Sequence, residues 1–305
     1  FSLVMVDEPD DEPGGGQGDA PVATHLYTQR LHQLASLVFT QERDVVDANA
    51  LTERGNSNVH FTGSPKIDNL AHEAEAGRSS WPLEEGKFKI VWAPHHSYSP
   101  HWYNFGVFSK IYVQMLEFAK ANSDIQIVLR PHPFLWSTLT DRKVLTESEL
   151  ASWRKSWDEL PNTSVDEDGS YAGLFLATDI LITDGISFLG EYPLVTGKPA
   201  IFFENADHWK FSATGEIAAA SSIRVKTFAE LKEMIEKAKN NSLPSRENEI
   251  QRLVEASSPH PGESASRIIE IIYDDFVGGP SPLVSKESIK ATPWELAAGR
   301  EPFGD

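Results

Sequence analysis

The stretch from Thr178 to Tyr192 holds the residue types best suited to binding an anion. It begins with an apolar run typical of a buried strand, breaks at Asp184-Gly185, and restarts as a helix with Ser187 in its first turn. At a helix start the backbone N–H groups lack partners and the dipole is positive, so a phosphate can be held without Lys or Arg. The alternative is an ordinary strand–helix junction with Asp184 as the cap.

Glu191 follows Ser187 by four residues and therefore shares its face of the predicted helix. A carboxylate at that position can accept both hydroxyls of a ribose while the helix start holds the phosphates. The alternative is an exposed helical glutamate, which is common. We predict that Asp184, Gly185, Ser187 and Glu191 bind a phosphorylated nucleoside.

Histidines cluster after another predicted strand, which ends at Ala93. His95, His96 and His101 lie within seven residues, together with Ser97. Three histidines could ligate a metal, but no carboxylate stands in ligand spacing among them, so no metal is predicted. Hydrogen bonding or charge donation to a phosphate is favoured, because imidazole titrates near neutrality. A surface aromatic loop is the alternative.

The segment Arg130-Pro131-His132-Pro133 follows a third predicted strand, which ends at Leu129. The two prolines restrict the backbone to an extended form and hold His132 rigidly, as suits a binding or catalytic residue. Arg130 has two open interpretations, since it could neutralise a phosphate or pair with an acidic neighbour.

A further predicted helix start, Pro261 to Arg267, combines small residues with one arginine. By the same helix-dipole argument, Arg267 is a candidate phosphate contact.

These polar segments need a scaffold that brings them together, and the chain predicts one from Lys87 onward. Strand-like runs alternate with segments of helical periodicity, and parallel strands need such crossover connections. The predicted strands are 88–93, 125–129, 165–166, the run before Asp184, and 198–203, and the predicted helices are 107–122, 145–159, 227–240 and 264–276. The fold class is therefore α/β, a doubly wound parallel sheet. Nearly every candidate motif lies just past a strand end.

Composition limits the function classes. The chain has 305 residues, is 40% hydrophobic and has no cysteine, which excludes disulfides, Cys-ligated zinc and thiol catalysis. A net charge of −18 argues against non-specific nucleic-acid binding, which needs a basic face. No segment is long and apolar enough to span a bilayer.

Taken together, the motifs resemble the CDP-glycerol glycerophosphotransferase family of teichoic acid and capsule synthesis. The resemblance runs from about Val59 to Ile272. The segments that carry it are Thr62–Asp68, Trp92–Ser97, Pro131–Pro133, Ile182–Ser187, Glu191 and Gly262–Arg267. The resemblance implies a Rossmann-like fold in a GT-B arrangement of two domains, with the nucleotide donor bound mainly on the C-terminal one.

Two departures from the family pattern affect what is expected. Gly185-Ile186 replaces a Tyr-Ser pair, and His95-His96-Ser97 replaces Thr-Trp-Arg. No Trp-His-Gly-Thr-Pro segment, which would supply the family's catalytic base from the N-terminal domain, occurs in the sequence. We therefore expect a GT-B C-terminal lobe with a partial N-terminal segment, either half of a larger enzyme or a relative that lost one lobe.

The expected organisation has four parts. Residues 1–23 form a flexible acidic segment rich in Gly and Pro, and 24–70 are the end of an N-terminal Rossmann-like domain with its junction. Residues 71–277 form the donor-binding domain, and 278–305 are a tail.

The resemblance implies a transferase that passes glycerol phosphate from a CDP-glycerol-like donor to a polymer or lipid-linked acceptor. His95, His96 and His132 are the expected catalytic residues, and Arg130, Asp184, Gly185, Ser187, Glu191 and Arg267 the donor-binding residues. No cofactor is expected. The expected location is cytoplasmic, with peripheral contact at the inner membrane face as an option. Alternatives are a nucleotide-sugar glycosyltransferase or epimerase of the same fold, or a non-catalytic nucleotide-binding lobe.

Overall fold

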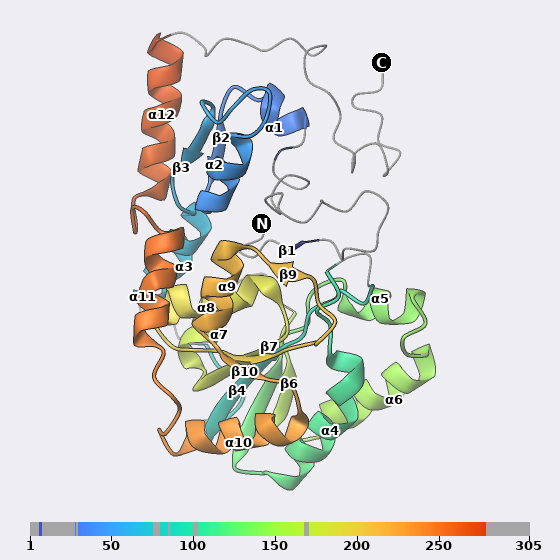
Figure 1. The fold of residues 1–305 in the computed structure, drawn as a ribbon. Helices are drawn as coiled ribbons and strands as arrows, with labels where there is room; N and C mark the ends of the chain where they lie inside the picture. Colours follow the sequence, from blue (N-terminus) through green and yellow to red (C-terminus); the bar gives the residue numbers. More distant parts are fainter. Residues whose placement is uncertain are drawn as a thin grey trace.

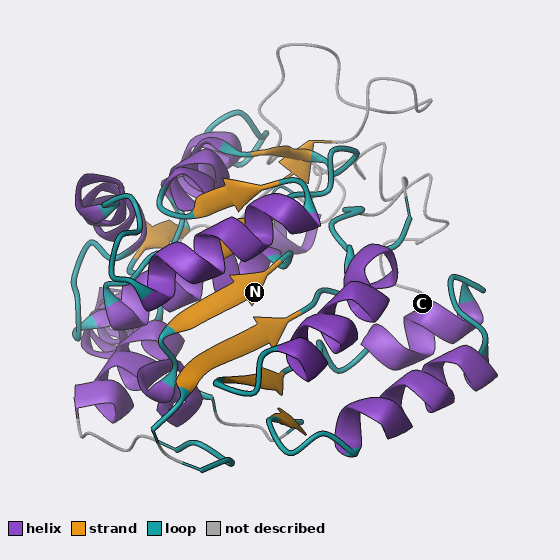
Figure 2. Ribbon diagram, turned by 90° about the horizontal axis from the view of Figure 1, so that it is seen from below, coloured by secondary structure: helices purple, strands orange, loops and turns teal. Residues whose placement is uncertain are grey.

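A computed structural model of the chain describes residues 6–7, 28, 30–75, 80–84, 86–99, 103–167 and 171–278. Its centre is a six-stranded sheet with helices packed on both faces (Figures 1 and 2). The six strands are β4 (Phe88–Ala93), β5 (Ile125–Leu129), β6 (Thr163–Val165), β7 (Ile180–Thr183), β8 (Ile201–Phe203) and β10 (Ile223–Val225).

Helices connect these strands and continue beyond the last one. They are α3 (Pro65–Glu75), α4 (Phe108–Ala121), α5 (Leu135–Asp141), α6 (Glu147–Asp158), α7 (Ala172–Ala177), α8 (Ile186–Thr196), α9 (Ala213–Ala220), α10 (Phe228–Lys239), α11 (Glu247–Ser257) and α12 (Ser264–Gly278).

The strands lie side by side in the order β6-β5-β4-β7-β8-β10, and every pairing is parallel. Read in chain order, this is the arrangement 3-2-1-4-5-6 of a doubly wound Rossmann-type sheet. The direction of winding reverses between β4 and β7, and ligands in such sheets bind in the crevice outside the carboxyl ends of the strands at that reversal. The predicted fold class is confirmed.

Alternate side chains of β4 show how the two faces are covered. Ile90 and Trp92 point to one face and pack in a cluster with apolar side chains of α4, α6 and α10. Val91 and Ala93 point to the other face, in a cluster with side chains of α3, α7 and α8. Because both faces are covered, the strand is almost continuously apolar, which is why the sequence shows it so clearly.

A small N-terminal unit stands apart from the main sheet, beside α12 in Figure 1. It consists of α1 (Arg30–Leu34), β2 (Val38–Thr40), α2 (Arg43–Asn49) and β3 (Val59–Phe61). Strands β2 and β3 pair in parallel and pack on α2 through a separate small core. This is a partial N-terminal segment, as predicted. The predicted boundary at residue 70 falls inside α3, which contacts α7 and α8 of the main domain.

Two predictions for the N-terminal half differ from the structure. The helical sequence pattern from Thr24 to Leu37 predicts one helix, but in the described residues the helix covers Arg30–Leu34, and Leu37 has no regular secondary structure. Strand β1 (Val6–Asp7) pairs antiparallel with β9 (Lys210–Phe211), so Asp7 belongs to a strand and not to the predicted flexible segment. The rest of that segment, 8–23, and the tail after Gly278 lie outside the described residues.

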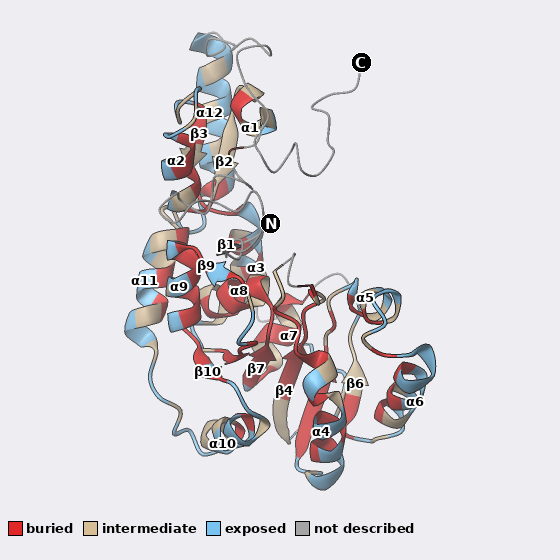
Figure 3. Cartoon of the chain, turned by 45° about the vertical axis from the view of Figure 1, so that its right-hand side comes forward, coloured by how far each residue is buried: buried red, intermediate tan, exposed pale blue. Residues whose placement is uncertain are grey.

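The C-terminal helix α12 is exposed along most of its length (Figure 3). Its exposed side chains include Ile269 at 66% and Phe276 at 84%. Its first turn is anchored, because the Asp68 carboxylate of α3 accepts the backbone N–H groups of Gly262 and Ser264, both at 2.9 Å. Among the helices of the described residues, none is long and apolar enough to cross a membrane.

Candidate functional site

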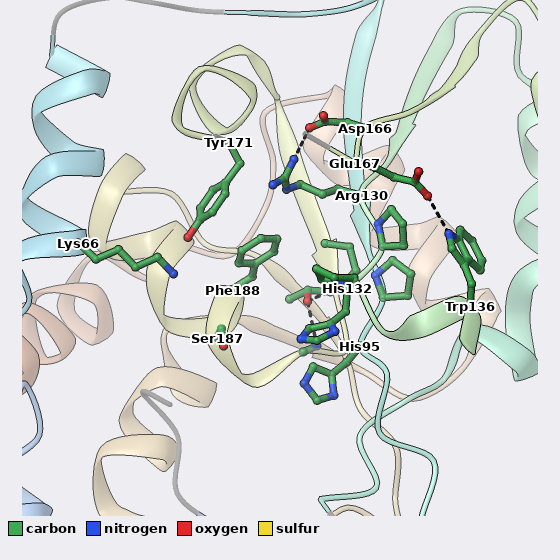
Figure 4. A pocket seen from close by; sticks show the side chains of 16 residues that line it. Lys66, His95, Arg130, His132, Trp136, Asp166, Glu167, Tyr171, Ser187 and Phe188 are labelled. Atoms are coloured by element: carbon green, nitrogen blue, oxygen red, sulfur yellow. Dashed lines mark hydrogen bonds and ion pairs between the residues drawn. The ribbon is translucent and has the colours of Figure 1, made fainter. Parts of the chain in front are cut away.

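A pocket of about 570 Å³ opens at the point where the winding of the sheet reverses (Figure 4). Loops after four adjacent strands line it. They contribute Pro94 and His95 after β4, Arg130 to Pro133 after β5, Asp166 and Glu167 after β6, and Thr183, Gly185, Ser187 and Phe188 at β7 and the start of α8. Lys66, Trp136 and Tyr171 complete the lining. The polar loops predicted from the sequence therefore meet in one place.

The start of α8 forms one wall of this pocket. Gly185 is the N-cap residue and provides no side-chain cap, while its own N–H donates to Thr183 Oγ1 at 2.9 Å. A Cβ atom at position 185 would come within 3.3 Å of Thr183 Oγ1 and 3.4 Å of the His95 side chain. A side chain at this position would therefore be tight against the Thr183 hydroxyl and in contact with the His95 side chain. Ser187, in the first turn, lines the same pocket.

Asp184 does not line the pocket, contrary to its predicted donor contact. Its side chain is 2% exposed, and its two oxygens accept the backbone N–H groups of His95 at 2.5 Å and Val107 at 2.6 Å. Burial raises the pKa of Asp184 to about 7, although the two backbone donors oppose that shift. Asp184 therefore joins the loop after β4 to the start of α4, and its effect on a ligand passes through His95.

Glu191 is also buried beneath the pocket wall and does not present its carboxylate to a ribose. The side chain is 0% exposed. One carboxylate oxygen pairs with Lys66 Nζ at 2.8 Å, and the other accepts the Tyr171 hydroxyl. Burial and the negative charge of Glu191 raise the pKa of Tyr171. The glutamate instead fixes Lys66 and Tyr171, which line the pocket in its place.

Of the two interpretations that its sequence context left open, the structure shows the pairing of Arg130 with an acidic neighbour. It lines the pocket, and its Nη1 pairs with Asp166 at 2.6 Å with only 11% of its side chain exposed. The guanidinium carbon also lies 5.0 Å from the Tyr171 ring centroid, a cation–π distance. The arginine is therefore rigidly held next to the space a phosphate would occupy.

The three predicted histidines converge from two loops. The ring centroids of His96 and His132 are 3.9 Å apart, and that of His95 lies 4.6 Å from His96 and 5.4 Å from His132. Their ring nitrogens come within 4.8 Å of one another, close enough to share one metal ion. Burial, with mutual repulsion between the rings, lowers the pKa of His132 to about 4 and places the pKa of His95 well below its usual value.

His96 faces a different space from the other two rings. It lines a neighbouring cavity of about 300 Å³ with Phe134, Thr138 and Arg142. Burial is the main cause that lowers its pKa, with a smaller contribution from Arg142. The tilted rings of His96 and His132 are thus in contact, with His132 lining the main pocket and His96 the neighbouring cavity.

Arg267 is not part of the site, contrary to prediction. Its guanidinium pairs along its own helix with Glu270 at 3.0 Å and Glu263 at 4.0 Å, and it does not line the pocket. Two N–H groups at that helix start, those of Gly262 and Ser264, are occupied by Asp68, as described above. The acid of α3 therefore already takes part of the donor capacity of this helix start.

Lys66, Trp136 and Tyr171 are among the pocket residues that were not predicted from the sequence. Lys66 lies within a segment that carries the family resemblance, which was the available signal. Trp136, in α5, and Tyr171, just before α7, had no such signal, since a single aromatic residue looks like any other. Trp136 is held by the Glu167 carboxylate, which accepts its Nε1–H at 2.8 Å, and by the Arg154 guanidinium at 4.9 Å from its ring centroid.

The arrangement can hold a phosphorylated ligand by local devices. Helix dipole, backbone N–H groups and imidazoles meet at one end of the pocket, and aromatic and carboxylate groups lie at the other. A nucleotide has an anionic phosphate part and a flat polar base. The first end of the pocket suits the phosphates, and the second suits the base.

The fold and the site define a Rossmann-type lobe of the GT-B arrangement. The sequence pattern of the family described as CDP-Glycerol:Poly(glycerophosphate) glycerophosphotransferase matches residues 53–274, well over half of the chain. The chain belongs to this family. No curated protein sequence matches it significantly.

Solved structures share the fold at low sequence identity. The wall teichoic acid polymerase TagF is 16% identical with a TM-score of 0.53, over 91% of this chain and 67% of the TagF chain. A TagF variant soaked with CDPG is 13% identical with the same score and coverage. The UDP-GlcNAc 2-epimerase from Neisseria meningitidis bound to UDP-GlcNAc is 17% identical with a TM-score of 0.50, over 80% of this chain and 63% of the epimerase. The chain thus spans about two thirds of the length of these proteins.

Proposed function

We propose that this chain is the donor-binding lobe of a transferase that passes glycerol phosphate from a CDP-glycerol-like donor to a hydroxyl of a cell-surface polymer. Membership of the glycerophosphotransferase family supports the reaction class. The observation that carries the proposal is the uncapped start of α8, with Ser187, opening on a pocket whose volume is that of a nucleotide-sized ligand.

In this proposal the diphosphate lies over the start of α8. Ser187 offers a hydroxyl donor at the helix start that Gly185 precedes, and His95 and His132 approach from the loops after β4 and β5. The nucleoside extends towards Tyr171 and Trp136, whose rings are fixed by carboxylates. Lys66 and Arg130 stand on the same wall, each already paired with one acid.

The transfer itself needs little covalent chemistry from the protein. The acceptor oxygen attacks the phosphorus that carries glycerol, a new P–O bond forms, and the anhydride bond breaks so that CMP leaves with the electron pair. His96 is proposed to take the acceptor proton, since it faces the neighbouring cavity and its lowered pKa keeps it neutral. Positioning, and donors aimed at the charge on the diphosphate, supply most of the acceleration.

Calorimetric titration separates the donor alternatives. The purified chain should bind CDP-glycerol and CDP more tightly than UDP-GlcNAc. Tighter binding of UDP-GlcNAc would favour a nucleotide-sugar enzyme of the same fold.

A turnover assay tests the assignment of the site. Full-length protein is incubated with CDP-glycerol and a poly(glycerophosphate) acceptor, and wild type is compared with His132→Ala. Loss of activity in the variant is expected, and equal activity would show that the site is wrongly assigned. CDP binding without turnover in either protein would favour a non-catalytic lobe. The cytoplasmic location, a lipid-linked acceptor and peripheral membrane contact stay predictions.

A further inference from the structure

The Nδ1 atoms of two pocket histidines both face backbone N–H donors. The N–H of Ser97 points at His95 Nδ1 at 3.3 Å, and the N–H of Phe134 points at His132 Nδ1 at 3.2 Å. A backbone N–H can only donate, so each of these Nδ1 atoms is an acceptor. Since a neutral imidazole carries one proton, that proton lies on Nε2 in both rings.

The Ser97 hydroxyl strengthens this assignment for His95. Ser97 Oγ accepts the backbone N–H of Phe105 at 2.9 Å, which leaves its own hydrogen available for donation. The nearest acceptor is His95 Nδ1, also at 2.9 Å. The Ser97 side chain and backbone therefore both direct donors at the same lone pair.

Nothing around the two rings stabilises a positive charge on them. No carboxylate of the described residues forms an ion pair with His95 or His132, and the carboxylate of Asp184, which accepts the backbone N–H of His95, is also occupied by that of Val107. Burial and the neighbouring imidazoles lower the pKa of both rings. The rings are neutral at physiological pH and keep the tautomer that the backbone imposes.

We propose that His95 and His132 form a neutral phosphoryl-binding pair, in which each ring donates its Nε2–H to the diphosphate and Ser97 is the positioning residue that fixes the tautomer of His95. This inference rests on the proposed function, because the diphosphate is the group that would receive both donors. Neutral donors suit this place, where the rings are too close together to carry two positive charges.

The cluster of His95, His96 and His132 also has the spacing of a metal site. The tautomers of His95 and His132 distinguish metal coordination from phosphate binding. A metal-bound histidine normally coordinates through one nitrogen and donates its other ring N–H to an oxygen acceptor. In His95 and His132 the second nitrogen faces donors instead. If Nε2 coordinated a metal, the ring proton would have to lie on Nδ1. Each Nδ1–H would then face a backbone N–H, and both hydrogen bonds to Nδ1 would be lost.

Proton–nitrogen NMR of the imidazole rings tests the tautomers without any ligand. Full-chain protein near neutral pH should show His95 and His132 as neutral rings protonated on Nε2, with the signals assigned by single substitution of each histidine. Added Zn²⁺ should leave these signals unchanged. Rings protonated on Nδ1, cationic rings, or stoichiometric Zn²⁺ coordination would overturn the proposal.

Amide replacements test the donor itself. In His132→Gln the side-chain amide reaches the position of Nε2–H, whereas in His132→Asn it replaces the Nδ1 side. CDP affinity should stay within about threefold of wild type in His132→Gln and fall by about tenfold in His132→Asn, the equivalent of one hydrogen bond. Equal losses in both variants would refute a neutral donor at Nε2. Wild type that failed to bind CDP would instead refute the proposed function, whatever the tautomers.

Ser97→Ala tests the positioning role. The His95 ring signals should shift towards a mixture of tautomers while those of His132 stay in place, and CDP affinity should fall by about fivefold. Ser156→Ala is the matched control, since Ser156 lies on α6 and its hydroxyl donates only to its own helix. Unchanged His95 signals in a folded Ser97→Ala protein would show that Ser97 does not set the tautomer.

Discussion

Replacing Glu191 with Gln tests whether this buried carboxylate holds the pocket wall or binds the ligand. The side chain is 0% exposed, and its oxygens take Lys66 Nζ at 2.8 Å and the Tyr171 hydroxyl. Glutamine has the same shape but is neutral, and it turns one acceptor into a donor. That donor must face either an ammonium or a hydroxyl.

The expected cost follows from those two contacts. Hydrogen bonds to a charged group contribute about 1.5–3 kcal/mol, and the contact with Lys66 belongs at the low end because 45% of the lysine side chain is exposed to screening solvent. We expect Glu191→Gln to lower the free energy of unfolding by about 2 kcal/mol, or Tm by roughly 4 °C. Urea unfolding and calorimetry measure these quantities.

A matched control is Glu233→Gln. Glu233 pairs with Lys237 at 2.7 Å on an exposed face of α10, where an ion pair contributes little. A double-mutant cycle of Glu191→Gln with Lys66→Met should give a coupling of about 1 kcal/mol or more, since the two side chains are in direct contact.

Two results would refute this reasoning. One is a stability change in Glu191→Gln no larger than that in Glu233→Gln. The other is a folded Glu191→Gln protein of wild-type stability that has lost nucleotide binding, because that outcome would return Glu191 to the direct ribose contact predicted from the sequence.

Three further substitutions address single features of the site. Asp184→Asn should cost about 1–3 kcal/mol of stability, because one buried backbone N–H would face an amide NH₂ group. Burial raises the pKa of Asp184 from its ordinary value of 3.8 to about 7, so the folded protein binds an extra proton between about pH 4 and pH 7 and loses stability as pH rises through that window. Asp184→Asn has no carboxyl to titrate, so its free energy of unfolding should vary less with pH across that window. A steeper pH dependence in the variant than in wild type would contradict the raised pKa of Asp184. Gly185→Ala should lower stability by about 1 kcal/mol, because its Cβ would press on the Thr183 hydroxyl, and should weaken CDP binding in calorimetry. An unchanged affinity would show that a glycine is not needed at this position. Arg267→Ala should leave CDP affinity unchanged, and a large loss would restore the phosphate contact predicted from the sequence.

The sequence alone predicts the centre of the fold well. Strands β4 and β5 were predicted with the bounds they have in the structure, because both are buried on two faces and read as continuous apolar runs. The helix predicted at 227–240 is α10 (Phe228–Lys239), and the sequence signal for its start, a capping box of Thr227 and Glu230, is present in the structure.

Three of the missed elements, α9, β10 and α5, lack such local signals. Helix α9 is composed largely of alanine and other small residues and shows no polar face, and β10 has only three residues. Helix α5 is short and follows directly on the prolines of the loop after β5. Helix α11 is amphipathic and was overlooked although its pattern is regular.

For the site residues, too, one part could be predicted from the sequence and another part could not. The sequence predicts which loops meet, because the carboxyl ends of parallel strands lie at one edge of the sheet. It does not predict which way a side chain turns once the chain has folded. Glu191 and Lys66 are 125 residues apart in sequence, so no spacing rule could show that they neutralise each other. Asp184 was likewise turned inwards by two backbone donors that only the tertiary fold brings near.

Because the charges of the pocket wall are neutralised, the rate of nucleotide binding should depend on ionic strength in an unusual way. Its two wall cations, Lys66 and Arg130, are each neutralised by an acid, and the chain as a whole carries a net charge of −18. An anionic nucleotide approaching from bulk solvent therefore meets long-range repulsion, while short-range dipoles hold it once it has docked. Because dissolved salt shortens the reach of the repulsion far more than it weakens contacts within the crevice, moderate salt should speed capture, the reverse of what is usual for phosphate-binding proteins.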